Sequence, residues 1–281
     1  MNKKTILLVL CIMCLIVSII CGCTESLDAI PQNATAVASQ SAMSLKDNGE
    51  YAKLSNTLIG WGLKKEKGKP PVMPDSISGL LKRYNGVYLS ETEGKTLYLT
   101  FDEGYENGYT APILDTLKAN NVPAAFFITG DYIKREPELV KRMADEGHIV
   151  GNHTMNHPSM PSVVSVAELA DEIVKLDDAY AELTGRHMRY IRPPRGEFSE
   201  RTLAVSMDLG YTSVFWSFAY ADWETDKQKG AQYAYDQVMP YLHDGAVILL
   251  HAVSKDNAEA LERIILDARS QGFAFKSLDE L

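Results

Sequence analysis

Residues 96–104 read Thr-Leu-Tyr-Leu-Thr-Phe-Asp-Glu-Gly. The first six residues are β-branched, aromatic or aliphatic, a composition typical of a strand that is buried on both faces. Strands of this kind belong to parallel sheets that are covered by helices. The stretch therefore predicts a buried parallel strand at 96–101, followed at once by the carboxylates of Asp102 and Glu103.

This strand opens a series in which short apolar runs alternate with helical segments. The later predicted strands lie at 124–128, 149–151, 190–192, 212–216, 246–250 and 273–275. The predicted helices between them lie at 110–120, 137–146, 166–184, 199–209, 228–242 and 257–271. Such alternation implies a parallel sheet, either doubly wound or closed as a barrel. About seven strands fall short of a standard barrel, so we expect an α/β fold, a distorted and incomplete (β/α) barrel.

The composition places the chain among globular proteins. It has 281 residues, 46% hydrophobic and 23% charged, which excludes collagen, a disordered tail and a polytopic membrane protein. The formal net charge is −9, and an acidic chain gains nothing from phosphate backbones, so no nucleic acid partner is expected. All four cysteines lie in the first 23 residues, so the folded part has no disulfide, cysteine-bound zinc or thiol nucleophile.

The N-terminus has the pattern of a secretory signal. Two lysines precede an apolar run at 6–20, which is short for a membrane-spanning helix. Ile-Cys-Gly-Cys at 20–23 resembles a bacterial lipobox. We expect residues 1–22 to be a lipoprotein signal peptide and Cys23 to carry the lipid; the alternative is an uncleaved signal anchor. Either arrangement holds the domain at the extracytoplasmic face of the bacterial cell membrane.

Three further segments follow. Residues 23–50 contain the lipidated cysteine and a polar stretch without a hydrophobic period, which predicts a flexible tether. Residues 51–95 carry scattered aromatic and aliphatic side chains and a predicted short helix at 77–84, and we interpret them as an N-terminal extension packed on the barrel. Residues 96–281 form the predicted catalytic domain.

Polar side chains follow five of the predicted strands. They are Asp102 and Glu103, His153 and His157, Arg192, Asp222 and Trp223, and His251. Because the carboxyl ends of parallel strands meet at one edge of a sheet, we expect these side chains to converge on one site.

His153 and His157 are four residues apart, a spacing that on a helix or turn suits two imidazoles on one divalent metal. The glutamate of a His-Glu-x-x-His motif is absent, so a general base must come from elsewhere. Asp102 is the candidate base, and Glu103 beside it is a possible third ligand. The alternatives are a capping or core role for the histidines and a solvated turn for the carboxylates.

The other candidates each have two interpretations. His251 ends an apolar strand and either acts as a general acid or satisfies backbone groups. Arg192 either keeps a carboxylate ionised or forms a structural ion pair. Trp223 stands between two acidic residues. This setting favours a partly exposed ring that stacks on a sugar; the alternative is a position in the core.

Several catalytic motifs are missing from the sequence. It has no Gly-x-Ser-x-Gly elbow, no Gly-x-Gly-x-x-Gly and no phosphate-binding loop. A serine hydrolase of the elbow type, a dinucleotide enzyme and a P-loop NTPase therefore lose support.

Four motifs together resemble the polysaccharide deacetylase (NodB-homology) family. They are Thr-Phe-Asp-Glu-Gly at 100–104, His-Thr-Met-Asn-His-Pro at 153–158, Arg-Pro-Pro-Arg-Gly at 192–196 and Leu-Leu-His at 249–251. The resemblance covers roughly residues 95–281. The stretches 60–62, 104–110, 192–202 and 254–261 resemble more closely the subgroup that makes muramic δ-lactam in spore cortex peptidoglycan.

The resemblance implies roles for individual residues. Asp102 matches the general base, Arg192 the arginine that orients it, His251 the catalytic histidine and Asp222 the aspartate that tunes it. His153 and His157 match the metal-binding histidines, and Glu103 stands where the family has a third ligand, usually aspartate. Arg195 replaces the usual aromatic residue, as in the δ-lactam subgroup. We expect Arg195, Trp223 and Tyr105 to contact the substrate.

The implied activity is metal-dependent de-N-acetylation of N-acetylmuramic acid in peptidoglycan glycan strands, which releases acetate and leads to muramic δ-lactam. The implied cofactor is a divalent metal ion, zinc first among the candidates. The expected partners are peptidoglycan strands and, through the lipid, the membrane; the chain is expected to be a monomer. The alternatives are a deacetylase of N-acetylglucosamine, chitin oligomers or xylan, and an inactive sugar-binding lipoprotein.

Overall fold

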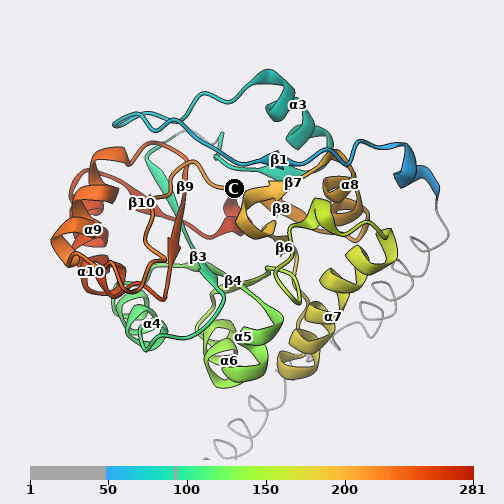
Figure 1. Ribbon diagram of the computed structural model, residues 1–281. Coiled ribbons are helices and arrows are strands. Elements are labelled where there is room, and N and C mark those ends of the chain that lie inside the picture. Colours follow the sequence, from blue (N-terminus) through green and yellow to red (C-terminus); the bar gives the residue numbers. More distant parts are fainter. Residues whose placement is uncertain (1–48, 92–93) are drawn as a thin grey trace, which may run out of the picture. The chain divides into compact units, whose positions relative to one another are not determined.

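The computed structural model describes residues 49–91 and 94–281 (Figure 1). The predicted signal peptide, the lipidation site and nearly all of the tether lie outside the described residues. Within the described part of the chain, no helix is long and apolar enough to cross a membrane.

A curled parallel sheet forms the centre of the fold. Its strands are β2 (Gly86–Val87), β3 (Thr96–Glu103), β4 (Ala124–Ile128), β5 (Ile149–Asn152), β6 (Tyr190–Ile191), β8 (Thr212–Val214), β9 (Ala246–His251) and β10 (Ala274–Phe275). β9 and β10 both pair with β3, and from β3 the order runs through β4, β5, β6 and β8 to β2. All of these ladders are parallel. Each predicted strand is present, and β2 is an addition from the N-terminal extension.

In the part of the chain that the structure describes, the sheet returns to its starting edge only through isolated bridges. Phe218, which follows β8, forms a parallel bridge with Ile248 of β9. Leu89, which follows β2, forms an antiparallel bridge with Ala246. Because the described residues form no continuous ladder between β8 and β9, the barrel is distorted and incomplete, and the predicted fold class is confirmed.

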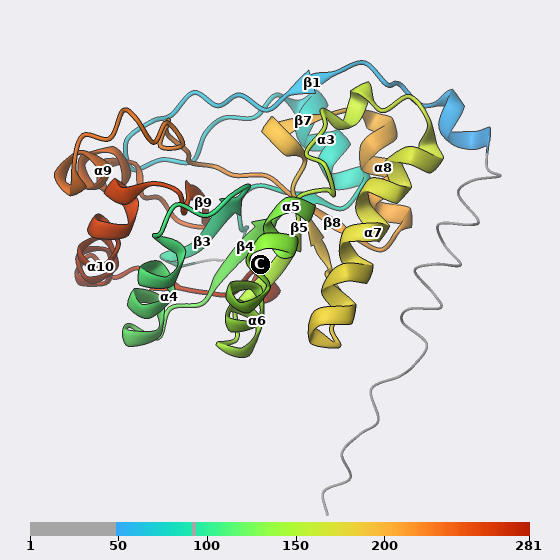
Figure 2. The ribbon, with the colours of Figure 1, turned by 60° about the horizontal axis from the view of Figure 1, so that its bottom comes forward.

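Helices cover the outer face of the sheet. They are α3 (Asp75–Arg83), α4 (Thr110–Ala119), α5 (Gly130–Arg135), α6 (Pro137–Asp145), α7 (Val166–Thr184), α8 (Glu200–Asp208), α9 (Ala231–Val238) and α10 (Lys255–Ser270). Figure 2 shows α4, α6 and α7 side by side. Their ends follow local capping rules: the Ser165 hydroxyl caps α7, and Gly185 ends it with φ 72°.

Two predicted boundaries and one omission need correction. The first strand does not stop at residue 101, since β3 continues through Asp102 and Glu103. The helix expected at 228–242 is shorter: α9 is followed by a 3-10 turn at Met239–Tyr241, because Pro240 lacks the N–H of a regular helix. α5 is not predicted by the sequence pattern, because its six residues are too few to show a hydrophobic period.

The two faces of β3 belong to different cores. Leu97, Leu99 and Phe101 pack in the large cluster that includes the helices. Tyr98, on the opposite face, packs with Phe127 in the smaller cluster inside the barrel. Because side chains alternate along a strand, Asp102 continues the inner face and Glu103 the outer face.

The N-terminal extension contributes to the sheets as well as covering them. Besides β2, it provides β1 (Ile59–Gly60), which pairs antiparallel with β7 (Glu197–Phe198). Trp61 follows β1, and its ring stacks on Phe215 at 4.4 Å between centroids. Its indole N–H donates to the Trp216 carbonyl at 3.0 Å. The extension is thereby attached to the segment that leaves β8.

Candidate active site

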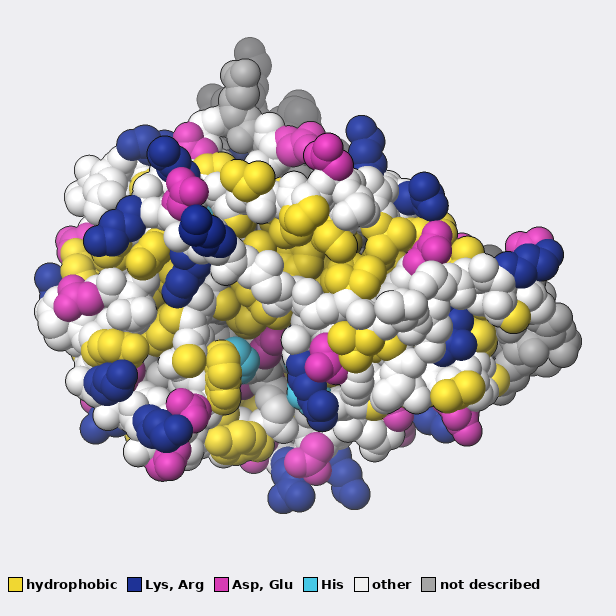
Figure 3. All heavy atoms as spheres, turned by 45° about the horizontal axis from the view of Figure 1, so that its top comes forward, with side chains coloured by type: hydrophobic (Ala, Val, Ile, Leu, Met, Phe, Trp, Pro, Cys, Tyr) yellow, Lys and Arg dark blue, Asp and Glu magenta, His cyan; other side chains and the backbone are white. Residues whose placement is uncertain are grey.

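A pocket of about 690 Å³ opens at the carboxyl ends of the strands. Its lining includes Asp102, Tyr105, His153, His157, Arg195, Trp216, Tyr220, Trp223 and His251. Figure 3 shows histidine and acidic side chains at the base of a hollow, beside hydrophobic and basic side chains. The predicted convergence of strand ends is therefore present in the structure.

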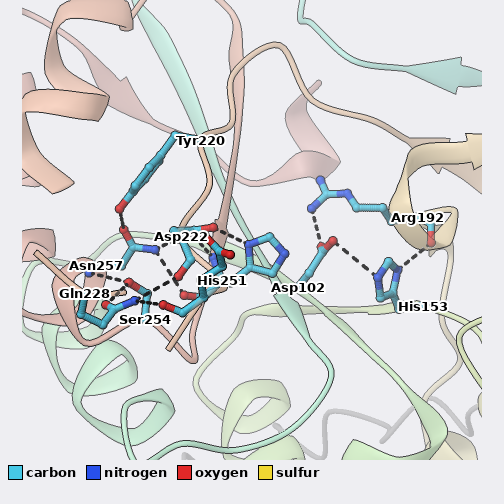
Figure 4. A network of polar contacts seen from close by, with 10 residues as sticks. Asp102, His153, Arg192, Tyr220, Asp222, Gln228, His251, Ser254 and Asn257 are labelled. Carbon is cyan, nitrogen blue, oxygen red and sulfur yellow. Dashed lines mark hydrogen bonds and ion pairs between the residues drawn. The ribbon is translucent and has the colours of Figure 1, made fainter. Parts of the chain in front are cut away.

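Asp102 is held by a buried arginine. Arg192 Nη1 donates to Asp102 Oδ1 at 2.7 Å (Figure 4). Burial raises the pKa of the Asp102 carboxyl, but the charges of Arg192, His153 and His251 outweigh burial and hold the pKa below its ordinary value. Asp102 is therefore ionised at neutral pH, with Oδ2 left to face His153.

Arg192 is itself fully enclosed, and each nitrogen of its guanidinium donates a hydrogen bond. Its exposed fraction is 0%, and its guanidinium lies 4.1 Å from the centroid of the Phe127 ring. Besides Asp102, it donates to the Val214 carbonyl at 3.1 Å and to the Thr100 hydroxyl at 2.8 Å. A buried charge with this many partners keeps one rotamer, so it fixes the carboxylate that it binds.

His153 and His157 meet in a loop and not on a helix. Thr154 and His157 both have positive φ, 66° and 56°, and this backbone brings the two rings to 4.9 Å between centroids. His153 Nδ1 hydrogen-bonds the Arg192 carbonyl at 2.7 Å, while Nε2 lies 3.5 Å from Asp102 Oδ2. Burial lowers the pKa of His153 to about 4. The ring is thus neutral near pH 7 and has Nε2 free of any strong hydrogen bond.

Glu103 does not join the two histidines. It does not line the pocket, its exposed fraction is 0%, and neither carboxyl oxygen has a hydrogen-bond partner. Burial, together with the charges of Glu106 and Asp102, raises its pKa well above the ordinary value, and nearby Thr110 offsets this only in part. Within the described residues, no three His, Cys, Asp or Glu side chains are spaced to hold a metal ion. Glu103, the possible third ligand, thus points away from the two histidines, because it still belongs to β3 and faces the outer side of the sheet.

His251 and Asp222 form the second charged pair. His251 Nδ1 lies 2.7 Å from Asp222 Oδ1, and the His251 backbone N–H donates to Oδ2 at 2.8 Å. Burial lowers the pKa of His251, but the charge and hydrogen bond of Asp222 outweigh burial and raise it above the ordinary value. In the register of β3 and β9, Asp102 is the partner of His251. A carboxylate with a lowered pKa and an imidazole with a raised pKa thus stand on neighbouring strands.

Comparison with known proteins agrees with this geometry. A family model for polysaccharide deacetylases matches residues 90–214. Peptidoglycan-N-acetylmuramic acid deacetylase PdaA of Bacillus subtilis is 46% identical over 228 residues, 80% of this chain and 86% of that protein. The chain belongs to the polysaccharide deacetylase family.

Two further similarities extend the assignment to most of this polysaccharide deacetylase. The solved structure of Bacillus subtilis PdaA, a family 4 carbohydrate esterase, superposes with a TM-score of 0.79 at 46% identity, covering 81% of this chain and 98% of that one. An uncharacterized 30.6 kDa protein of Geobacillus stearothermophilus is 50% identical over 232 residues, 82% of this chain and 87% of that protein. The enzyme is accordingly a deacetylase, a hydrolase that acts on amide bonds.

The side chains expected to contact substrate lie at the rim of the deacetylase pocket. Tyr105 and Trp223 are 49% and 53% exposed, and the Trp223 ring meets His251 edge-on at 5.5 Å. Arg195 lies in a tight turn with φ 59°. Within the described residues its guanidinium has no hydrogen bond or ion pair. All three are therefore accessible to a bound sugar.

Three polar residues of this site were not predicted from the sequence. Thr100 accepts from Arg192, and Asn257 and Tyr220 form a chain of hydrogen bonds behind Asp222. Asn257 had one visible signal, since it follows the His251 strand in a stretch that resembles the δ-lactam subgroup. Thr100 and Tyr220 resemble ordinary strand and core residues, and only the tertiary contacts reveal them.

Proposed function

We propose that this deacetylase removes the acetyl group from N-acetylmuramic residues of peptidoglycan glycan strands, with a divalent metal, and that the product leads to muramic δ-lactam. The similarity to the muramic acid deacetylase PdaA supports the substrate class. The observation that carries the proposal is the pairing of Asp102 with Arg192 and of His251 with Asp222 on neighbouring strands.

The two pairs supply the proton transfers of amide hydrolysis. Asp102, kept ionised by Arg192, accepts a proton from the water that attacks the acetamide carbonyl. His251, whose pKa Asp222 raises, gives a proton to the nitrogen as the carbon–nitrogen bond breaks. Acetate and a free amino sugar result. On a muramic residue without peptide, the new amine and the lactyl carboxyl can then condense to the δ-lactam with loss of water.

His153 and His157 are the residues that would hold the metal. Their donor chemistry fits a divalent ion: the rings are adjacent, burial lowers the pKa of both, and His153 is oriented by the Arg192 carbonyl through its other nitrogen. Histidine nitrogen makes zinc the first candidate, although other divalent ions accept the same ligands. When bound, such an ion polarises the acetamide carbonyl. Glu103 is left out of this ligand set.

Arg195 supports the choice of muramic acid among acetylated sugars. A muramic residue without its peptide carries a lactyl carboxylate, which a glucosamine residue lacks. Arg195 lines the pocket and has no anionic partner in the described part of the chain. A guanidinium binds a carboxylate through two parallel hydrogen bonds, so Arg195 is the residue suited to recognise this group.

We also propose that Cys23 is lipidated and holds a monomeric enzyme at the outer face of the cell membrane. The basic start, the apolar run and the Ile-Cys-Gly-Cys sequence support this placement. A sporulation role rests on the resemblance to the δ-lactam subgroup.

Glycan strands stripped of peptide provide the test. The full chain is incubated with them, and acetate release and fragment masses are followed with and without chelator and added divalent ions. Loss of acetyl from muramic residues, sensitive to chelator, is the expected result, and Asp102→Asn serves as the inactive control. Activity confined to glucosamine oligomers or xylan would reassign the substrate. Glycan binding without acetate release from any acetylated sugar would identify an inactive binding protein.

A further inference from the structure

Asn257 lies directly behind the Asp222–His251 pair, in the first turn of α10. It is 1% exposed. Its Nδ2 donates to Asp222 Oδ2 at 2.5 Å and to the His251 carbonyl at 3.3 Å. Its Oδ1 accepts a short hydrogen bond from the Tyr220 hydroxyl (Figure 4). One amide thus connects a pocket-lining tyrosine with the carboxylate behind the catalytic histidine.

The chemistry of these groups fixes every orientation in the chain. A carboxylate only accepts hydrogen bonds, so the amide nitrogen of Asn257 must face Asp222. The amide oxygen then faces Tyr220, whose hydroxyl must donate. Asp222 Oδ2 is occupied by Asn257 and by the His251 backbone N–H, which leaves Oδ1 for the imidazole. His251 Nδ1 therefore carries a proton, and Nε2 is the nitrogen left for the substrate.

We propose that Asn257 is a positioning residue for the catalytic acid: it fixes the rotation of the Asp222 carboxylate, and Tyr220 fixes Asn257 in turn. This role rests on the proposed deacetylation, in which His251 is the proton donor. It assigns a function to a buried amide that neither contacts the pocket nor takes part in proton transfer.

Asn257→Leu tests the proposal, since leucine has a similar volume and no hydrogen-bonding group. Without the amide, Asp222 loses its fixed rotation and aligns less well with the imidazole. We expect kcat to fall about tenfold with KM unchanged. We also expect the alkaline limb of the pH–rate profile to move to lower pH, because His251 holds its proton less firmly.

The direction of the pH shift separates positioning from two other roles of the Asn257 amide: a purely structural contact, and a weakening of the Asp222 carboxylate as a base. Besides Asp222, the charged groups that act on the His251 ring are Asp102, Arg192 and, across the pocket, His157. The Asn257 variant leaves these in place. A wild-type kcat and profile in a folded variant would reduce Asn257 to a structural contact. A shift of the alkaline limb to higher pH would show that the amide only weakens the carboxylate as a base, which would also overturn the proposal.

Tyr220→Phe tests the second link and keeps the ring that lines the pocket. Tyr220→Phe should lower kcat less than Asn257→Leu does. It should also move the alkaline limb of the pH–rate profile in the same direction, to lower pH. In the double variant the effects should not add, because Tyr220 acts through Asn257. Additive effects would remove Tyr220 from the chain. If Asn257→Leu does not fold, Asn257→Ser and Tyr220→Phe carry the test.

Asp256→Asn is the matched control. Asp256 is the neighbouring buried residue of α10, and it accepts from the Lys229 backbone N–H at 2.6 Å without contacting Asp222. Asp256→Asn should keep the wild-type pH–rate profile even if it lowers thermal stability.

An NMR titration of the His251 ring gives the same comparison without substrate. A downward shift of the His251 pKa in Asn257→Leu would support the positioning role. If the wild-type chain nevertheless released no acetate, the proposed reaction would be rejected and the positioning role would stand. No shift would reject the positioning alone.

Discussion

Arg192 and Asp102 form a buried ion pair at 2.7 Å, in which the arginine is wholly enclosed by protein. Removing one partner of such a pair leaves the other charge buried without compensation. The pair therefore connects the stability of the barrel with the ionisation of the proposed base.

Arg192→Met should lower the free energy of unfolding by about 3–5 kcal/mol at neutral pH. The Asp102 pKa is depressed in the folded protein, so its contribution is present above the ordinary aspartate pKa and is lost as pH falls through the folded value. The deficit of the variant should shrink in acid. Urea denaturation at neutral and acidic pH measures it.

Arg189→Met is the control for this prediction. Arg189 pairs with Asp279 at the surface, where its side chain is 67% exposed. Its loss should cost less than about 1 kcal/mol. Equal costs for the two variants would show that the buried pair has no special role in stability.

Asp222→Asn should move the alkaline limb of the pH–rate profile to lower pH. Asp222 is the main group that raises the His251 pKa against the effect of burial, so its neutralisation lets the imidazole lose its proton earlier. The loss of rate should be greater at about pH 8 than at about pH 6. A uniform loss across both pH values would contradict a role for Asp222 in the protonation of His251.

Arg195→Ala should raise KM for peptide-free muramic strands by about ten- to hundredfold, the range of one lost charge-assisted pair. The rate on N-acetylglucosamine oligomers should be little changed, because they lack the lactyl carboxylate. Arg263→Ala, an exposed change on α10, is the control. Equal losses on both substrates would mean that Arg195 does not read the carboxylate.

Glu103→Gln should leave metal affinity and kcat close to wild type. The structure places this side chain on the outer face of β3, where burial raises the carboxyl pKa well above its ordinary value, and an amide has the same shape as the carboxyl. His153→Ala and His157→Ala should each weaken binding of zinc in isothermal titration calorimetry. If Glu103→Gln removes binding as strongly as they do, Glu103 is a ligand after all.

Gly196→Ala should destabilise the turn that carries Arg195. Gly196 has φ 66°, and a Cβ there would lie 2.7 Å from Trp61 Cβ. The expected cost is about 2–4 kcal/mol, from strain and overpacking together, with a higher KM for muramic strands. Gly185→Ala is the control, because Gly185 has a similar φ of 72° but open space around it. This variant has backbone strain without overpacking and should cost about 1 kcal/mol. Thermal unfolding compares the two.

The sequence predicted elements well where the signal is local. The strand at 124–128 matches β4 to the residue, and the helix at 166–184 matches α7, because apolar runs and capping residues act over a few positions. The short β1 and β7 escaped prediction, because each has two residues and exists only through its partner.

The residue pattern alone is enough to predict which strand ends meet at the pocket. Asp102, His153, Arg192, Asp222 and His251 follow or end parallel strands, and parallel strands share one carboxyl edge. The direction of each side chain depends on the tertiary fold. β3 is two residues longer than predicted, which turns Glu103 away from the histidines, and positive φ angles in a loop, not a helix, bring His153 to His157. The physical reason is that strand length and loop conformation depend on packing and hydrogen bonds between distant segments, which a residue pattern does not contain.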